Sequence, residues 1–114
     1  MAINHEDYQV EYDKETGTIV CRGSFRLRGS EEYKPILELM ISAIDALPTL
    51  LTLDVCDLQF LNSSGITTLS KFIIQVRKQK ISDVVIKGSA KYPWQSKSLK
   101  NFQRLLPGLR LEID

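Results

Sequence analysis

Apolar and polar residues along the chain follow patterns that predict five strands. Residues 8–13 alternate between apolar and polar side chains with a period of two, which is typical of a strand with one buried face. Residues 18–25 hold a more continuous apolar run. The Gly-containing turn between the two segments predicts an antiparallel hairpin, with residues 8–13 at the edge of the sheet. Further short apolar runs predict strands over residues 50–55, 83–87 and 109–113.

Apolar residues spaced three and four positions apart predict a first helix that ends at Pro48. Proline is tolerated only in the first turn of a helix, so Pro35 predicts a regular helix from Lys34 and not from Glu31. Ser30 is the candidate capping residue, because its hydroxyl can accept a bond from an amide of the first turn.

The same spacing predicts two more helices, over residues 63–79 and 96–106, with residues 92–94 as a loop before the last one. The predicted order is therefore ββαβαβαβ, in which strands separated by helices indicate parallel βαβ units. We expect a single α/β domain over residues 1–114. It is built on one mixed sheet that is mostly parallel and has an antiparallel N-terminal edge strand.

The composition is that of an ordinary globular domain, with 43% hydrophobic and 25% charged residues among 114. The formal net charge of +1 argues against nonspecific attraction to nucleic acid or to a membrane surface. No run approaches the roughly 18 apolar residues of a membrane span. The N-terminus lacks the basic and apolar regions of a signal peptide. Cys21 and Cys56 show no metal-type spacing, so we expect free thiols in a reducing cytoplasm.

Few side chains in this sequence are suited to catalysis. His5 is the only histidine and is expected in a mobile polar tail, so no Ser-His-Asp or Cys-His set can form around it. No glycine-rich phosphate loop is present. Asp54, Asp57 and the nearby serines could hold a divalent ion, but acids at the end of a strand more often bond to backbone amides. We therefore predict a protein without enzymatic activity, cofactor or resident metal.

The most informative stretch is the junction over residues 50–66. A buried strand is expected to give way to an irregular segment with two acids, and then to a helix that begins at Ser63 or Ser64. Asn62 and the serines are suited to the helix start, because their side-chain oxygens accept amide hydrogens there. Free amides and the helix dipole also favour negative charge at this place. The junction predicts either an ordinary capped helix or an anion-tolerant site that carries two hydroxyls.

Residues 57–66, Asp-Leu-Gln-Phe-Leu-Asn-Ser-Ser-Gly-Ile, resemble the signature of STAS domains, the anti-sigma factor antagonist family that also occurs at the ends of sulfate transporters. The family's usual form is an acid, an apolar pair, and then Asp-Ser-Ser-Gly or Asp-Ser-Thr-Gly. The hydroxyl residue before that glycine is phosphorylated by a partner kinase, and here it is Ser64. Asn62 stands where the family usually has aspartate. Residues 21–25 and 99–109 extend the resemblance to an early strand and the closing helix, and the resemblance further implies helices mainly on one face of the sheet.

The resemblance implies a non-enzymatic regulatory domain that acts in bacterial transcription control. It would bind a serine kinase or anti-sigma factor and be switched by phosphorylation at Ser64, with Ser63 as the secondary candidate and a phosphatase as the reversing partner. A phosphoserine adds about −1.5 to −2 charges, which a helix N-terminus offsets and a docked partner surface does not. The residues expected at the partner surface are Asn62, Ser63, Gly65, Thr67, Thr68 and Lys71, together with residues 26–29 and 58–61, and with Asp54 and Asp57 in support.

Two other interpretations stay open. A constitutive STAS scaffold, or an accessory subunit of a larger signalling or transport complex, would dock without a phosphorylation cycle. A small-ligand sensor would bind an anion or nucleotide at residues 63–65. Asn62 leaves the first alternative open, because an amide keeps the capping ability of aspartate but brings no charge. Trp94 either forms an exposed aromatic rim at an interface or pins its own loop to the core, and the oligomeric state is open as well.

Overall fold

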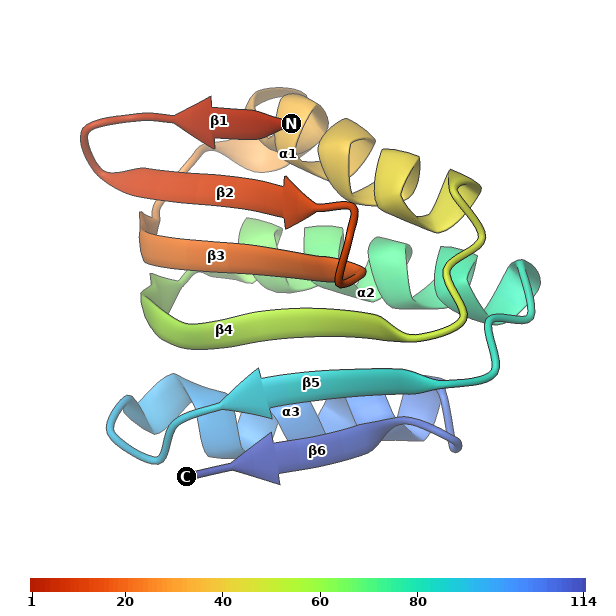
Figure 1. Cartoon of the computed structure of the whole chain (residues 1–114). Coiled ribbons are helices and arrows are strands. Elements are labelled where there is room, and N and C mark those ends of the chain that lie inside the picture. The colour runs from red at the N-terminus through yellow and green to blue at the C-terminus, as the bar shows by residue number, and fades with distance from the viewer.

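Three helices cover one face of a six-stranded sheet in the computed structural model, which describes residues 1–114 (Figure 1). The spatial order of the strands is their order in the chain. The elements are β1 (Ala2–Asn4), β2 (Tyr8–Asp13), β3 (Thr18–Phe25), α1 (Gly29–Asp45), β4 (Leu51–Leu61), α2 (Ser63–Lys78), β5 (Val84–Gly88), α3 (Pro93–Leu105) and β6 (Arg110–Ile113).

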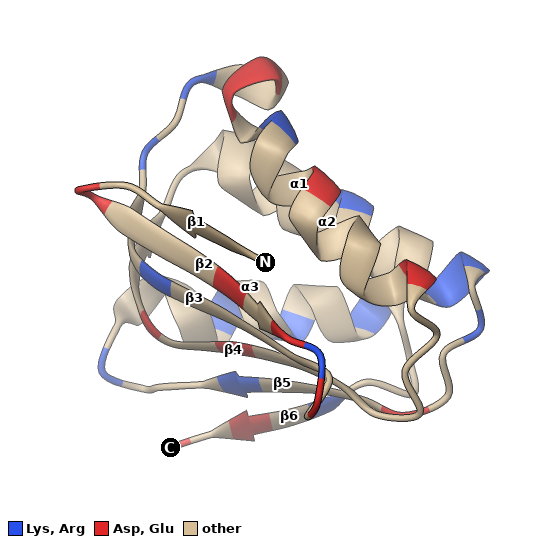
Figure 2. Ribbon diagram, turned by 45° about the horizontal axis from the view of Figure 1, so that its top comes forward, with Lys and Arg blue, Asp and Glu red and all other residues tan.

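The directions of the strands explain why the helices share one face. β1, β2 and β3 pair antiparallel, whereas β3, β4, β5 and β6 pair parallel. Each crossover, through α1, α2 or α3, advances by one strand in the same direction, and right-handed crossovers in one direction all pass over the same face. Figures 1 and 2 show α1, α2 and α3 on that face. The predicted mixed α/β sheet with helices on one face is confirmed.

The N-terminal edge of the sheet differs from the prediction. β1 pairs with the outer side of β2, with Ile3 opposite Val10, so residues 8–13 are not the edge strand. Three residues are too few for an alternating pattern to stand out in the sequence. The expectation of a mobile tail around His5 is therefore wrong: His5 lies in the turn between two strands, and its ring stacks on Tyr8 with 4.6 Å between the ring centroids.

The start of α1 also differs from the prediction. The helix begins at Gly29, so Pro35 lies inside it and not in its first turn. Pro35 is exposed, and water can bond to the carbonyl that lacks a helical partner one turn before it. Ser30 does not cap the helix. Instead, the carboxylate of Glu32 accepts a bond from the backbone N–H of Arg28 at 3.0 Å.

α3 begins at Pro93, so the loop predicted for residues 92–94 is mostly helix. Proline suits the first helical position, where no amide donor is needed. The half-buried Trp94 donates its indole N–H to the carbonyl of Leu58 at 2.9 Å. Of the two roles open for Trp94, the structure therefore supports the second, in which the side chain fixes its own segment to the core.

The hydrophobic core fills the space between the sheet and the helices. Cys21 lies in this core and Cys56 is half-buried, and both are free thiols. Burial raises the pKa of Cys21 to about 12 and that of Cys56 to about 11, so both stay protonated and are weak nucleophiles at neutral pH. None of the three helices has the length and apolar character that a membrane crossing requires.

Candidate functional site

β4 leads directly to the candidate site and is longer than the sequence predicts. It continues to Leu61, one residue before Asn62, the N-cap of α2. Its pairing with β3 shifts register at two places in its C-terminal half. A register shift breaks the period-two pattern of a strand, which is why residues 54–61 look irregular in the sequence. The predicted irregular segment is therefore a continuous strand.

The two acids of β4 do not gather at the start of α2. The carboxylate of Asp54 accepts the amide N–H of Cys56 at 3.0 Å and so braces the first register shift. Asp54 lies roughly 25 Å from Asn62 along the extended strand, too far to contact the serine hydroxyls. Asp57 is exposed and opposite Arg22 of β3. No group of three or more His, Cys, Asp or Glu side chains is placed to hold a metal ion.

Asn62 is the residue that joins β4, α1 and α2 at the site. Its Oδ1 accepts bonds from the Tyr33 hydroxyl at 2.6 Å and from the Gly65 N–H at 2.9 Å. Its Nδ2 donates to the carbonyl of Leu27 at 2.8 Å. Burial raises the pKa of Tyr33 to about 12, so the tyrosine stays protonated and remains a donor. An aspartate at position 62 could make the two acceptor bonds, but it would direct an oxygen at the Leu27 carbonyl.

Gly65 allows β4 and α1 to approach the first turn of α2 closely. A Cβ at this position would lie 2.3 Å from Cδ1 of Leu61 and 2.8 Å from the Tyr33 hydroxyl oxygen. Neither distance is compatible with van der Waals contact, so a side chain here would displace the Tyr33 hydroxyl from Asn62. The glycine of the sequence motif is therefore required for packing.

Ser63 and Ser64 occupy the first two positions of α2, with Ser63 exposed and Ser64 half-buried. Their carbonyls accept bonds from the hydroxyls of Thr67 and Thr68, at 3.1 and 2.9 Å. Their own hydroxyls are left to solvent. The first amides of a helix have no intrahelical acceptor; here the Asn62 side chain accepts from the Gly65 amide and its carbonyl accepts from the Ile66 amide. Two amides and two hydroxyls thus remain available at the positive end of the helix.

The other residues predicted for the partner surface divide into two groups. Thr67 and Lys71 are exposed, as the prediction requires. Thr68 is only 4% exposed and its hydroxyl bonds to the Ser64 carbonyl, so its predicted place on the surface is wrong. Thr68 lies three positions after Gly65, beside the apolar stripe of α2. The sequence pattern did not include Thr68 in that stripe.

The two other segments predicted for the docking surface, residues 26–29 and 58–61, place an exposed aromatic side chain beside this turn. Phe60 is 37% exposed, and the guanidinium of Arg26 lies 4.4 Å from the centroid of its ring. The register shift turns Phe60 towards the same side as Ser24, away from the core. Phe60 and Arg26 therefore extend the accessible surface from the start of α2 to the end of β3. The sequence predicts both segments near the docking surface, but it does not predict that Arg26 covers Phe60, because the two residues are far apart in the chain.

No family model matches the sequence, and no curated protein matches it. Solved structures match its fold. SiaC of Pseudomonas aeruginosa has a TM-score of 0.76 and 16% sequence identity over 100% of this chain and 96% of that one. A chain from the crystal structure of the diguanylate cyclase SiaD in complex with its activator SiaC, from the same organism, has a TM-score of 0.77 and 14% identity over 100% and 99% of the two chains. At these identities the likeness shows a common fold, and the STAS resemblance stays a prediction from the motif.

Proposed function

We propose that this chain is a regulatory domain that docks on a partner protein through the surface around the first turn of α2, and that phosphorylation of Ser64 switches the docking. The observation that carries the proposal is the position of Ser64. It lies in the first helical turn, partly exposed, with a hydroxyl that no protein group uses, while Asn62 holds the turn from the inside. A kinase can reach this hydroxyl without unfolding the turn.

The fold should tolerate a phosphate at this position. A phosphoserine carries about −1.5 to −2 charges, and the free amides and dipole of a helix N-terminus stabilise a charge by about 0.3–1 kcal/mol. No acidic residue in the first turn of α2 opposes it. A docked apolar or acidic partner surface would oppose it strongly. A coupling of about 3 kcal/mol would weaken the partner's affinity more than a hundredfold.

Two lines of support indicate the class of partner. The sequence motif resembles domains that bind a serine kinase or anti-sigma factor. The fold resembles SiaC, which binds and activates the diguanylate cyclase SiaD. We propose that a serine kinase modifies Ser64, that a phosphatase restores it, and that the unmodified form binds a signalling effector, either an anti-sigma factor or an enzyme that the domain activates.

Constitutive docking without phosphorylation is the second candidate, and Asn62 favours it. The amide of Asn62 makes three bonds within the chain and offers no carboxylate to orient the Ser64 hydroxyl or to help hold the metal of a kinase. In this case the surface of Ser63, Thr67, Phe60 and Lys71 would serve as a permanent interface of a larger assembly.

One set of bait proteins separates the two candidates. Each bait captures partners from the source cell, and quantitative mass spectrometry measures what is captured. The baits are wild type, Ser64→Ala, Ser64→Asp and Ser63→Asp. Under the switch, Ser64→Asp loses the effector that Ser64→Ala retains, and its unfolding free energy stays within about 0.5 kcal/mol of wild type. Ser63→Asp adds the same charge one residue away on the same surface, so loss of the effector with Ser63→Asp but not with Ser64→Asp would move the switch to Ser63. Equal effector capture by all four baits, with Ser64 unmodified in the cell, would leave constitutive docking as the function.

A further inference from the structure

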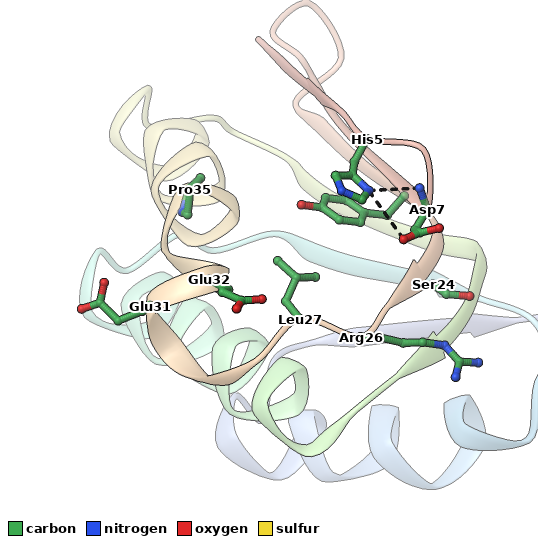
Figure 3. A pocket seen from close by; sticks show the side chains of 9 residues that line it. His5, Asp7, Ser24, Arg26, Leu27, Glu31, Glu32 and Pro35 are labelled. Carbon is green, nitrogen blue, oxygen red and sulfur yellow. Dashed lines mark hydrogen bonds and ion pairs between the residues drawn. The ribbon is translucent and has the colours of Figure 1, made fainter.

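A cavity of about 420 Å³ lies beside the first turn of α1, at the turn between β1 and β2 (Figure 3). Its volume is within the range of about 300–1,000 Å³ that is usual for specific binding sites. No function described above uses it. The lining residues that bear on its chemistry are His5, Asp7, Tyr8, Leu27, Glu32 and Pro35.

One wall of this cavity is aromatic and firmly held. The ring of His5 stacks on that of Tyr8 with an interplanar angle of 10°. Tyr8 in turn packs edge-on against the buried Phe25, with 5.4 Å between the centroids. Leu27 and Pro35 add apolar surface opposite this wall. The result is a preformed slot with a flat aromatic side.

The charges around the slot are predominantly negative. Asp7, Glu31 and Glu32 line the cavity together with Tyr8, and burial, with the charges of Glu32 and then Asp7, raises the pKa of the Tyr8 hydroxyl. The Asp7 side chain is 69% exposed, and Glu32 uses only Oε1, as the acceptor for the Arg28 amide. Arg26 is the cation of the lining, but its guanidinium stacks on Phe60 and points away from the slot in Figure 3. The cavity is thus lined by the carboxylates of Asp7, Glu31 and Glu32, and the Asp7 carboxylate lies 3.8 Å from Nδ1 of His5.

We infer that this slot receives a lysine or arginine side chain of the docked partner. A guanidinium or ammonium group can stack on the face of Tyr8 and pair with Asp7 and Glu32, and its methylene groups can pack on Leu27 and Pro35. Charge complementarity therefore selects a basic side chain over an acidic or neutral one.

The slot is continuous with the surface around α2, and the inference rests on the proposed docking function. Leu27 lines the slot, and its carbonyl is the acceptor for Asn62 Nδ2. Arg26 lines the slot on one side and covers Phe60 on the other. A partner that lies across the first turn of α2 therefore meets the mouth of the slot with the same face. A protein side chain is the occupant that uses both features together.

The test is an NMR titration of the whole ¹⁵N-labelled chain with the capped peptide Gly-Gly-Arg-Gly-Gly and with the same peptide carrying citrulline, which lacks the charge. We expect the arginine peptide to shift the amide signals of Asp7, Tyr8 and Leu27 with a Kd in the millimolar range, and the citrulline peptide not to. The double variant Asp7→Asn, Glu32→Gln should weaken binding at least about tenfold. Glu38→Gln is the control on the same helix, because Glu38 is exposed and does not line this cavity, and it should bind as wild type does.

Equal shifts with both peptides, shifts that do not saturate, or full binding by the double variant would overturn the inference. Ser64→Asp is titrated in parallel and should bind the arginine peptide normally. If it binds the peptide and also retains the effector in the capture experiment, the phosphorylation switch fails while the slot stands. If wild type retains a Ser64-dependent effector but ignores the arginine peptide, the slot fails while the switch stands.

Discussion

Two amide side chains, Asn62 and Gln95, anchor opposite sides of β4 in the same chemical way. Asn62 makes three bonds, to Tyr33, Leu27 and Gly65, and ties the end of β4 to α1 and α2. Gln95 of α3 also makes three, accepting from the Ser89 amide and donating to two carbonyls of β4, Val55 at 2.7 Å and Leu58 at 3.1 Å. Where a strand bends, backbone donors and acceptors both lose their ladder partners, and an amide can satisfy both kinds.

The difference between the two anchors lies in what they leave at the surface. Gln95 is fully buried, at 0% exposure, and all its bonds face inward. Asn62 is half-exposed, and the hydroxyls of Ser63 and Ser64 directly follow it. The comparison teaches that the region around Gln95 is stabilised by bonds that lie entirely inside the molecule. The turn at Asn62 is held by as many bonds and still leaves the hydroxyls of Ser63 and Ser64 without a partner in the chain.

The largest effect is expected at the buried anchor. Gln95→Ala leaves the Ser89 amide and the Val55 carbonyl without partners, and each such buried group costs about 1–3 kcal/mol, so we expect a loss of about 3 kcal/mol in the free energy of unfolding by urea. Gln103→Ala is the matched control, since Gln103 makes one partly buried bond and should cost about 1 kcal/mol. Similar losses in the two variants would mean that burial does not distinguish Gln95.

A smaller effect is expected from Gly65→Ala, which tests the packing beneath the serine turn. The new Cβ overlaps Leu61 and the Tyr33 hydroxyl, and such overpacking costs about 1–3 kcal/mol. Gly108→Ala is the control, because a Cβ there meets no atom within 4 Å, and it should be nearly neutral in the same urea titration. If Gly65→Ala leaves the free energy of unfolding unchanged, the turn can adjust to a side chain at this position, and the close packing around Gly65 is not required.

The smallest effect is expected from Asn62→Asp. The substitution retains the two acceptor bonds and gains charge at the helix N-terminus, but it replaces the donor to Leu27 with an oxygen. We expect a net loss of about 1 kcal/mol by urea unfolding, less than for Asn62→Ala, which loses all three bonds. If the aspartate variant is as stable as wild type, the Leu27 bond contributes nothing and the amide is not needed for the fold. Phosphorylation of this variant by the kinase would then measure what a carboxylate adds at that position.

Much of the fold follows from local pattern, and the errors have local causes. Strands β2, β3 and β5 and helix α2 appear close to their predicted bounds, because each has a clear apolar period. β1 was missed because three residues give no period, and the second half of β4 was taken as irregular because register shifts interrupt the alternation. The start of α1 was placed too late because Pro35 stands in the helix interior.

The candidate site was predicted in part. The capped start of α2, the first-turn serines and the exposure of Thr67 and Lys71 follow from residue type and helical spacing. Asp54 was assigned to the site because it is near in sequence, but an extended strand carries it far from Asn62. The partners of Asn62 could not be named, because Tyr33 and Leu27 come from segments about thirty residues earlier in the chain.

The sequence by itself determined the class of fold and the place of the serines, because both depend on short-range order: the period of apolar residues and the capping preference of Asn and Ser. Only the tertiary structure decided which way each polar side chain faces. The crossovers bring α1 beside α2, so that the Asn62 amide turns inward to Tyr33 and Leu27 and the hydroxyl of Ser64 is left outside. That division between bonded and free polar groups depends on backbone donors and acceptors supplied by distant segments, and no local pattern encodes it.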